Sequence, residues 1–243
     1  MGIDTAMNWL KSPIPARRRK AVNYLVHLSL KKEKKKPEIY NALVKLLDDE
    51  DWSVRASTVT ALTNLVLSYE KKLDELIDIL LTHLTDKHPS VRATIIDNLS
   101  KILQKAPNTF SDRIIDAFNQ TIEDDNAHVK SATLRLLIEM GKYRKELFLE
   151  RYEEIVEMSN NVNSEIRRWA LKTLYEYLEY LDNEKLESLI ELLLKHINDD
   201  DFKIREITIN ILSKLVNTGK LKIDTNTIKL LRKRIRDDTI PVR

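Results

Sequence analysis

The sequence contains no cysteine and very little glycine or proline. Among its 243 residues there are three Gly, six Pro and no Cys. The missing Cys excludes disulfides, thiolate metal sites and a cysteine nucleophile. Because β-sheets and their hairpin turns use many Gly residues, the scarcity of Gly and Pro favours long helices joined by short turns.

The sequence also lacks recognisable membrane and secretion signals. Its first residues do not show the basic, apolar, small-residue order of a signal peptide. The most apolar stretch, Leu76–Leu84, is interrupted by Asp78, Thr82 and His83, so no run approaches the roughly 18–20 apolar residues that cross a bilayer. We therefore expect a cytoplasmic protein without membrane contacts.

Charged residues, by contrast, are abundant. They make up 33% of the chain, and hydrophobic residues make up 42%. High charge without oxidisable thiols is typical of thermophile proteins, in which ion-pair networks are common. The charge is uneven: residues 1–40 carry a net +7, residues 220–243 carry +5, and the middle of the chain carries −9.

A short pattern recurs along the whole chain. An aliphatic residue and a basic residue stand together, and further aliphatic residues follow the first of them at fixed distances. The copies are Val54-Arg55, Val91-Arg92, Val129-Lys130, Ile166-Arg167, Ile204-Arg205 and Val242-Arg243, with a degenerate copy at Arg17-Arg18. Successive copies lie 37 or 38 residues apart, which indicates an array of repeats.

Each repeat is predicted to contain two helices. Apolar residues three and four positions apart precede the pair, as at Leu76, Leu80 and Leu84, and follow it, as at Ile95 and Leu99. An acidic turn separates the helices, where carboxylates can cap the second one. One helical pair cannot bury its apolar faces alone, so neighbouring pairs must stack.

The prediction is an all-α, right-handed superhelix of about six helical hairpins that forms a single domain over residues 1–243. A helix at 224–238 follows the last hairpin and has no partner helix in the sequence. Either the chain is the first part of a longer array, or this helix mediates self-association. The hairpins are expected at about 3–31, 37–69, 70–106, 108–142, 143–181 and 182–219.

In these repeats the chain resembles the HEAT-repeat family. The resemblance implies that the basic residue after the aliphatic position pairs with turn acids of an adjacent repeat. The residues at that position are Arg55, Arg92, Lys130, Arg167 and Arg205. HEAT proteins serve many cellular roles with similar core patterns, so the resemblance implies the fold more strongly than any one function.

No catalytic or cofactor motif is found. The five His residues (27, 83, 88, 128 and 196) form no metal-binding pair on one helix face, and the three Gly residues are too scattered for a phosphate loop. HEAT-like alkylpurine DNA glycosylases are similar in size, but here Trp9, Trp52 and Trp169 lack an Asp one helical turn later. We predict a protein that is not an enzyme and has no metal or cofactor, with such a glycosylase as a weaker alternative.

The predicted function is a scaffold that binds a protein partner of unknown identity on its concave face. In HEAT stacks the second helices line that face, and the positions six and ten residues after each aliphatic anchor should point outward. These residues are Asn23, His27, Thr60, Asn64, Asp97, Lys101, Arg135, Glu139, Lys172, Glu176, Asn210 and Lys214. Three of the pairs are opposite charges four residues apart, which suits either a solvated helix surface or a mixed-charge groove.

The alternative is a nucleic-acid-associated protein that binds phosphate through basic clusters near its N-terminus. Positive charge of this kind would make binding depend strongly on salt. The candidate residues are Arg17, Arg18, Arg19, Lys20, Lys31, Lys32, Lys34, Lys35 and Lys36.

Overall fold

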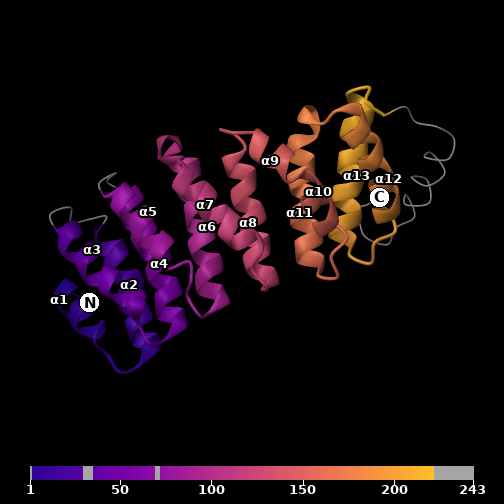
Figure 1. Cartoon of the computed structure of the whole chain (residues 1–243). Coiled ribbons are helices and arrows are strands. Elements are labelled where there is room, and N and C mark those ends of the chain that lie inside the picture. Colours follow the sequence, from indigo (N-terminus) through magenta and orange to yellow (C-terminus); the bar gives the residue numbers. More distant parts are fainter. Residues whose placement is uncertain (1, 30–34, 69–71, 222–243) are drawn as a thin grey trace. The chain divides into compact units, whose positions relative to one another are not determined.

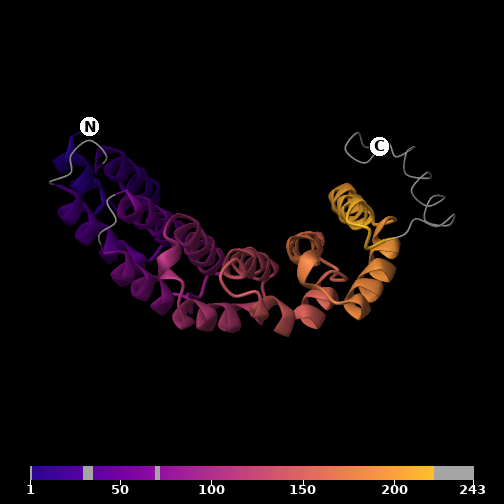
Figure 2. The ribbon, with the colours of Figure 1, turned by 90° about the horizontal axis from the view of Figure 1, so that it is seen from above.

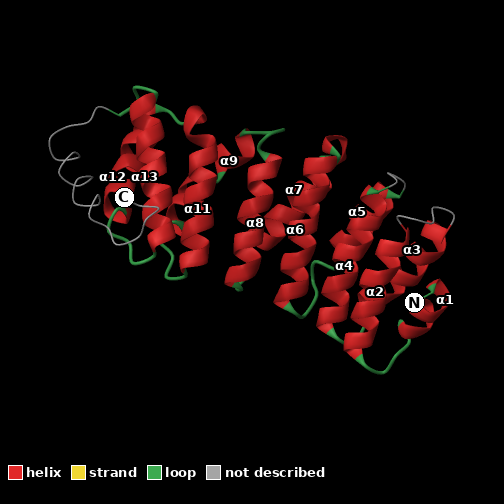
Figure 3. Cartoon of the chain, turned by 180° about the vertical axis from the view of Figure 1, so that it is seen from behind, coloured by secondary structure: helices red, strands yellow, loops and turns green. Residues whose placement is uncertain are grey.

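The structure is a computed structural model that describes residues 2–29, 35–68 and 72–221 (Figure 1). Regular secondary structure in these ranges is entirely helical (Figure 3), which confirms the all-α prediction. The expected helix 224–238 and the last copy of the repeat pattern lie outside the described residues. Contacts divide the chain into two compact units, Met1–Met140 and Gly141–Arg243, which we call unit 1 and unit 2. A single domain over 1–243 stays a prediction.

Along unit 1, the first and second helices of successive hairpins alternate. The first helices of its hairpins are α1 (Ile3–Trp9), α3 (Lys36–Val44), α5 (Leu73–Thr82) and α7 (Asp112–Ile122). The second helices are α2 (Pro15–Ser29), α4 (Trp52–Leu67), α6 (Pro89–Lys105) and α8 (Ala127–Met140). Two 3₁₀ turns, η2 (Lys45–Asp48) and η3 (Pro107–Thr109), complete the unit.

Unit 2 repeats this order with one difference. Its first helices are α12 (Asn183–His196) and a broken pair, α9 (Glu146–Glu150) and α10 (Tyr152–Met158). Its second helices are α11 (Ser164–Tyr177), followed by the 3₁₀ turn η4 (Leu178–Tyr180), and α13 (Phe202–Asn217). Helix α13 ends in a turn at Gly219, whose φ of +72° is a conformation that favours glycine.

Within unit 1 the second helices lie side by side in one layer, and the first helices form a second layer behind them (Figure 2). Helix α4 packs between α2 and α6, and α6 packs in turn against α8. In unit 2, α11 packs against α13 and both contact first helices. We call the exposed side of the second-helix layer, away from the first helices, the second-helix face of each unit.

The core lies between the two layers. Leu62, Leu99 and Leu137, which occupy the position eight residues after the aliphatic anchor in unit 1, are fully buried. The periodicity that identified the repeats is therefore the periodicity of core residues, as expected when stacked hairpins share one interior.

Candidate functional site

The turn between the two helices of each hairpin has the same construction in successive repeats. The side chain of Asp86 accepts a hydrogen bond from the backbone N–H of His88, at 2.8 Å. His88 then caps α6, because its Nδ1 accepts from the N–H of Ser90 at 3.2 Å. Asp49 and Asp51 do the same before α4, and Asp199 and Asp201 before α13.

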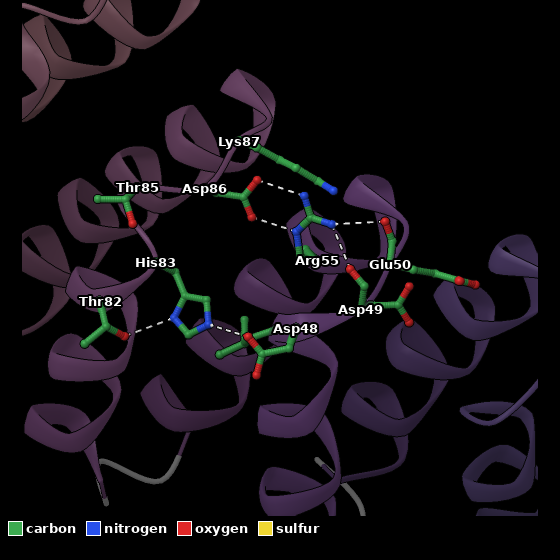
Figure 4. A pocket seen from close by; sticks show the side chains of 10 residues that line it. Asp48, Asp49, Glu50, Arg55, Thr82, His83, Thr85, Asp86 and Lys87 are labelled. Carbon is green, nitrogen blue, oxygen red and sulfur yellow. Dashed lines mark hydrogen bonds and ion pairs between the residues drawn. The ribbon is translucent and has the colours of Figure 1, made fainter.

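Within each unit, an arginine joins one such turn to the next. The guanidinium of Arg55 donates to the backbone carbonyl of Asp49 in its own repeat, at 2.7 Å. It also donates two parallel hydrogen bonds to the carboxylate of Asp86 in the following repeat, at 2.6 and 2.8 Å (Figure 4). Such two-point pairing combines strength with a fixed geometry. Because one residue holds both turns, it sets the spacing between hairpins.

The same arrangement recurs along the chain, and we call it the arginine ladder. Its ion pairs, each 31 or 32 residues apart in sequence, are Arg18–Asp49, Arg55–Asp86, Arg92–Asp124 and Arg167–Asp199. The pairing implied for Arg55, Arg92 and Arg167 by the family resemblance is thus present. Arg205 donates to the carbonyl of Asp199, and its ladder partner would lie outside the described residues. At the position 31 residues after Lys130 the sequence has Asn161, which is not an acid.

The ladder shifts the acid–base properties of its members. Burial by itself raises the pKa of Asp86, but hydrogen bonds from Arg55 and from the backbone of His88 outweigh it and hold that pKa below the ordinary value. Asp124 and Asp199 have lowered pKa values for the same reasons. These carboxylates stay ionised and paired, so they are poor candidates for proton transfer.

An open cavity of about 440 Å³ lies between the turns of the second and third repeats (Figure 4). Arg55 and Asp86 line it and are bound to each other, and Nε2 of His83 approaches the carboxylate of Asp48 to 3.4 Å. In the described part of the chain no group of three or more His, Cys, Asp or Glu side chains could hold a metal ion. Two contacts in this cavity, Arg55–Asp86 and His83–Asp48, link neighbouring repeats.

The residues predicted for the concave face all lie on second helices, but their exposure differs. Six are exposed: Asn23, His27, Thr60, Lys172, Glu176 and Asn210. Five are partly buried: Asn64, Asp97, Lys101, Arg135 and Lys214. Glu139 differs from the expectation, since it is only 7% exposed and its carboxylate accepts a hydrogen bond from Gln104 at 2.9 Å.

Several of these side chains contact the neighbouring second helix. Arg135 donates to both carboxylate oxygens of Asp97, 38 residues earlier, at 2.8 and 3.0 Å. Lys101 donates to the side-chain oxygen of Asn64, 37 residues earlier. The sequence suggested partners four residues apart along one helix, whereas these contacts run between repeats, because stacking brings equivalent positions together.

The basic residues near the N-terminus fall into distinct environments. Arg18 is 6% exposed and belongs to the arginine ladder, and Lys36 is 4% exposed, so neither is free to contact phosphate. Lys35 forms an ion pair with Glu38 at 2.7 Å. Arg17, Arg19 and Lys20 are exposed on α2, whereas Lys31, Lys32 and Lys34 lie outside the described residues.

Aromatic rings contact some of the predicted site residues, which the sequence analysis did not indicate. The cations of Arg17 and Lys20 both lie 5.9 Å from the ring centre of Trp9, and Nζ of Lys172 lies 4.2 Å from that of Trp169. Trp52 stacks on the ring of His88, with 4.1 Å between ring centres. Only the last contact links residues of different repeats, so the repeat period could have revealed it.

No described helix combines the length and the hydrophobicity required to span a membrane. No curated protein matches the sequence at a significant level.

Solved structures with a similar fold are repeat proteins. The Escherichia coli protein YibA is 18% identical with a TM-score of 0.71, and the match covers 99% of this chain and 78% of YibA. Importin beta is 15% identical with a TM-score of 0.60 over 99% of this chain, which spans 32% of the importin chain. A computationally designed armadillo repeat protein for modular peptide recognition is 17% identical, with a TM-score of 0.52, over 87% of this chain and 99% of the designed one. At these identities the likeness shows the fold alone.

Two family models match the sequence itself. The HEAT-repeat model matches residues 3–100. The model described as non-SMC mitotic condensation complex subunit 1 matches residues 66–197, more than half of the chain. Together with the stacked hairpins and the arginine ladder, these matches show that the chain belongs to the HEAT-repeat family, and within it to the family of condensation complex subunit 1.

Proposed function

We propose that this chain is a non-catalytic scaffold that binds a protein partner through the second-helix faces of its repeats. The observation that carries the proposal is the difference between the polar residues of the turns and those of the second helices. The ladder residues of the turns are occupied in joining repeats, and the cap residues are occupied in capping the second helices. Polar side chains of the second helices, such as Thr60, Lys172 and Asn210, are exposed.

Similar proteins support this proposal. Peptide recognition is the stated purpose of the designed armadillo protein, and the matching subunit family is named for a multi-subunit complex. An array of stacked helices offers a long surface whose side chains can change without loss of the core, which suits the binding of an extended partner.

The nucleic-acid alternative has less support. Of the nine basic residues considered for phosphate binding, the described exposed and unpaired ones are Arg17, Arg19 and Lys20. Among the described residues, the cations that could hold a duplex lie on one short helix segment, although duplex binding usually relies on many phosphate contacts. We therefore retain a protein partner as the proposed function.

The test compares bulky substitutions on the two layers. Partners recovered from the cells that produce the protein are purified, and their affinity for the chain is measured by calorimetry. Thr60→Trp and Asn210→Trp, on second helices, are expected to weaken binding by about tenfold or more by steric exclusion. The matched controls are Asn41→Trp on α3 and Ser188→Trp on α12, exposed positions on first helices, which should leave affinity within about twofold. The proposal would be contradicted if the second-helix and first-helix variants lost affinity equally, or if the second-helix variants lost none.

A further inference from the structure

Charge in unit 1 is segregated between its two layers. The second helices α2, α4, α6 and α8 contain ten Lys or Arg and two acids. The first helices α1, α3, α5 and α7 contain two Lys or Arg and seven acids. The two layers face opposite directions (Figure 2), so the second-helix side of this unit is positive and the first-helix side is negative.

The two acids of the second-helix layer, Asp97 and Glu139, contribute little negative charge to its exposed face. Asp97 is bound by Arg135, and Glu139 is buried and accepts a hydrogen bond from Gln104. Three of the cations, Arg18, Arg55 and Arg92, belong to the arginine ladder and face the turns. The free charge left on the second-helix face of unit 1 is therefore positive.

Among the described residues of this face, the strongest concentration of free cations is on α2. Arg17, Arg19 and Lys20 are exposed, and no carboxylate in the described part of the chain lies within ion-pair distance of them. Arg19 has only a longer-range electrostatic interaction, with Asp51 at the start of α4. Lys20 is aligned with Asn23 and His27, three and seven residues later, opposite the buried stripe that contains Ala21 and Leu25. We call Arg17, Arg19 and Lys20 the α2 cations.

The position of Arg17 is unfavourable for the stability of its own helix. The first turn of α2 contains no acid, and Arg17 in that turn stands near the positive end of the helix dipole. Helices α4 and α13 begin instead with an Asp whose carboxylate accepts backbone N–H groups. A local arrangement that opposes stability is expected where function requires it.

We propose that the second-helix face of unit 1 binds an acidic segment of a partner protein, with the α2 cations contacting its carboxylates. This inference rests on the proposed function and names the chemistry of the partner. Carboxylate side chains of an extended segment would lie at α2. The next part of the segment would cross the uncharged side chains of Thr60 and Asn64 on α4 and then reach Lys101 on α6.

The spacing of the cations favours an acidic protein segment over nucleic acid. Helix α4, between α2 and α6, contributes only the buried Arg55. Packed helices lie about 8–10 Å apart, so some 20 Å of the face separates the α2 cations from Lys101. Duplex DNA carries one negative charge per about 1.7 Å of its axis and would leave many phosphates without a partner across that gap.

The experiment measures binding of short fluorescent peptides to the full chain by anisotropy. The probe has six Glu followed by six alternating Gly and Ser; companions replace Glu by Gln or by Lys, and a single-stranded oligothymidylate is the fourth probe. We expect the Glu peptide to bind best, and its affinity to fall as salt rises from 50 to 200 mM.

The test variant is Arg19→Gln/Lys20→Gln. Its control is Lys45→Gln/Lys87→Gln, which removes the same charge from exposed positions outside the second helices. The test variant should bind the Glu peptide about fivefold or more weakly, and the control less than twofold. The thermal midpoint of the test variant should change little, because both side chains are exposed.

Equal losses in the two variants, no binding of the Glu peptide, or tighter binding of the oligothymidylate would overturn the inference. The inference would also be overturned if light scattering showed concentration-dependent self-association of the chain that the Glu peptide does not reverse. If the Gln or Lys peptide binds instead and Thr60→Trp abolishes that binding, the acidic partner is rejected while the scaffold proposal stands.

Discussion

At the scale of single residues, close packing decides which side chains are replaceable. Gly141 lies directly against Tyr177, whose ring stacks on Phe148 with 4.3 Å between ring centres. A Cβ atom at position 141 would overlap the phenol group of Tyr177. The glycine here provides space for an aromatic cluster in the core of unit 2.

Gly141→Ala is therefore expected to destabilise unit 2. Because the phenol and the ring stack would have to shift, we expect a loss of about 1–3 kcal/mol in the free energy of unfolding. Urea unfolding followed by circular dichroism measures it. Gly2→Ala is the control, since nothing lies within 4 Å of the Cβ it would add. An unchanged midpoint for Gly141→Ala would show that Tyr177 is not held in place.

His196 gives unit 2 a dependence on mildly acidic pH. It is 6% exposed, and burial lowers its pKa, although Asp199 opposes the shift. A histidine with a lowered pKa stays neutral in the folded chain while it takes up a proton in the unfolded chain. Stability is therefore complete above the unfolded pKa of about 6.5 and falls as pH decreases below it.

We predict that the free energy of unfolding falls by at most about 1.4 kcal/mol per pH unit below pH 6.5. This pH dependence should disappear in the His196→Leu variant. Trp9→Phe and Trp52→Phe leave Trp169 as the single tryptophan, so its fluorescence during urea unfolding reports on unit 2. If the wild-type slope persists in the His196→Leu chain, the dependence arises elsewhere.

At the scale of elements, the arginine ladder holds hairpins in register. Arg55 and Asp86 are about equally buried, with side chains 6% and 7% exposed. Removing one member leaves a buried charge without its partner, whereas removing both does not. The pair thus stabilises the stack mainly because each member requires the other.

Asp86→Ala is expected to cost about 3 kcal/mol or more of unfolding free energy, and Arg55→Ala a similar amount. The double variant should lose clearly less than the sum of the two. Asp48→Ala, at a side chain that is 85% exposed, is the control and should change stability by less than about 0.5 kcal/mol. Additive effects in this double-mutant cycle, measured by urea unfolding, would mean that the two side chains act independently.

At the scale of the whole molecule, the ladder acids determine how the chain responds to strong acid. Asp86 and Asp124 in unit 1 and Asp199 in unit 2 all have lowered pKa values. A carboxyl group of this kind stabilises the fold fully above its unfolded pKa of about 3.9. That contribution is lost as pH falls from there through the folded value.

Both units should therefore lose stability between about pH 4 and the lower folded pKa values. Urea unfolding at pH 5, 4 and 3 measures this. The triple variant Asp86→Asn/Asp124→Asn/Asp199→Asn should be less stable at pH 5 and lose less on acidification. A steeper loss in the variant would contradict the assignment.

The sequence by itself determined the repeat and its two-helix unit, because stacked hairpins place the same core and turn positions at a constant interval. It also indicated the arginine ladder, through the family resemblance. It did not determine which second-helix positions are exposed: Glu176 and Glu139 both lie ten residues after their anchors, yet one is exposed and the other buried. Nor did it show that Arg135 contacts Asp97 in the preceding repeat. Only the tertiary structure decided these points, since exposure and pairing depend on the offset between neighbouring helices, which periodicity along one helix does not contain.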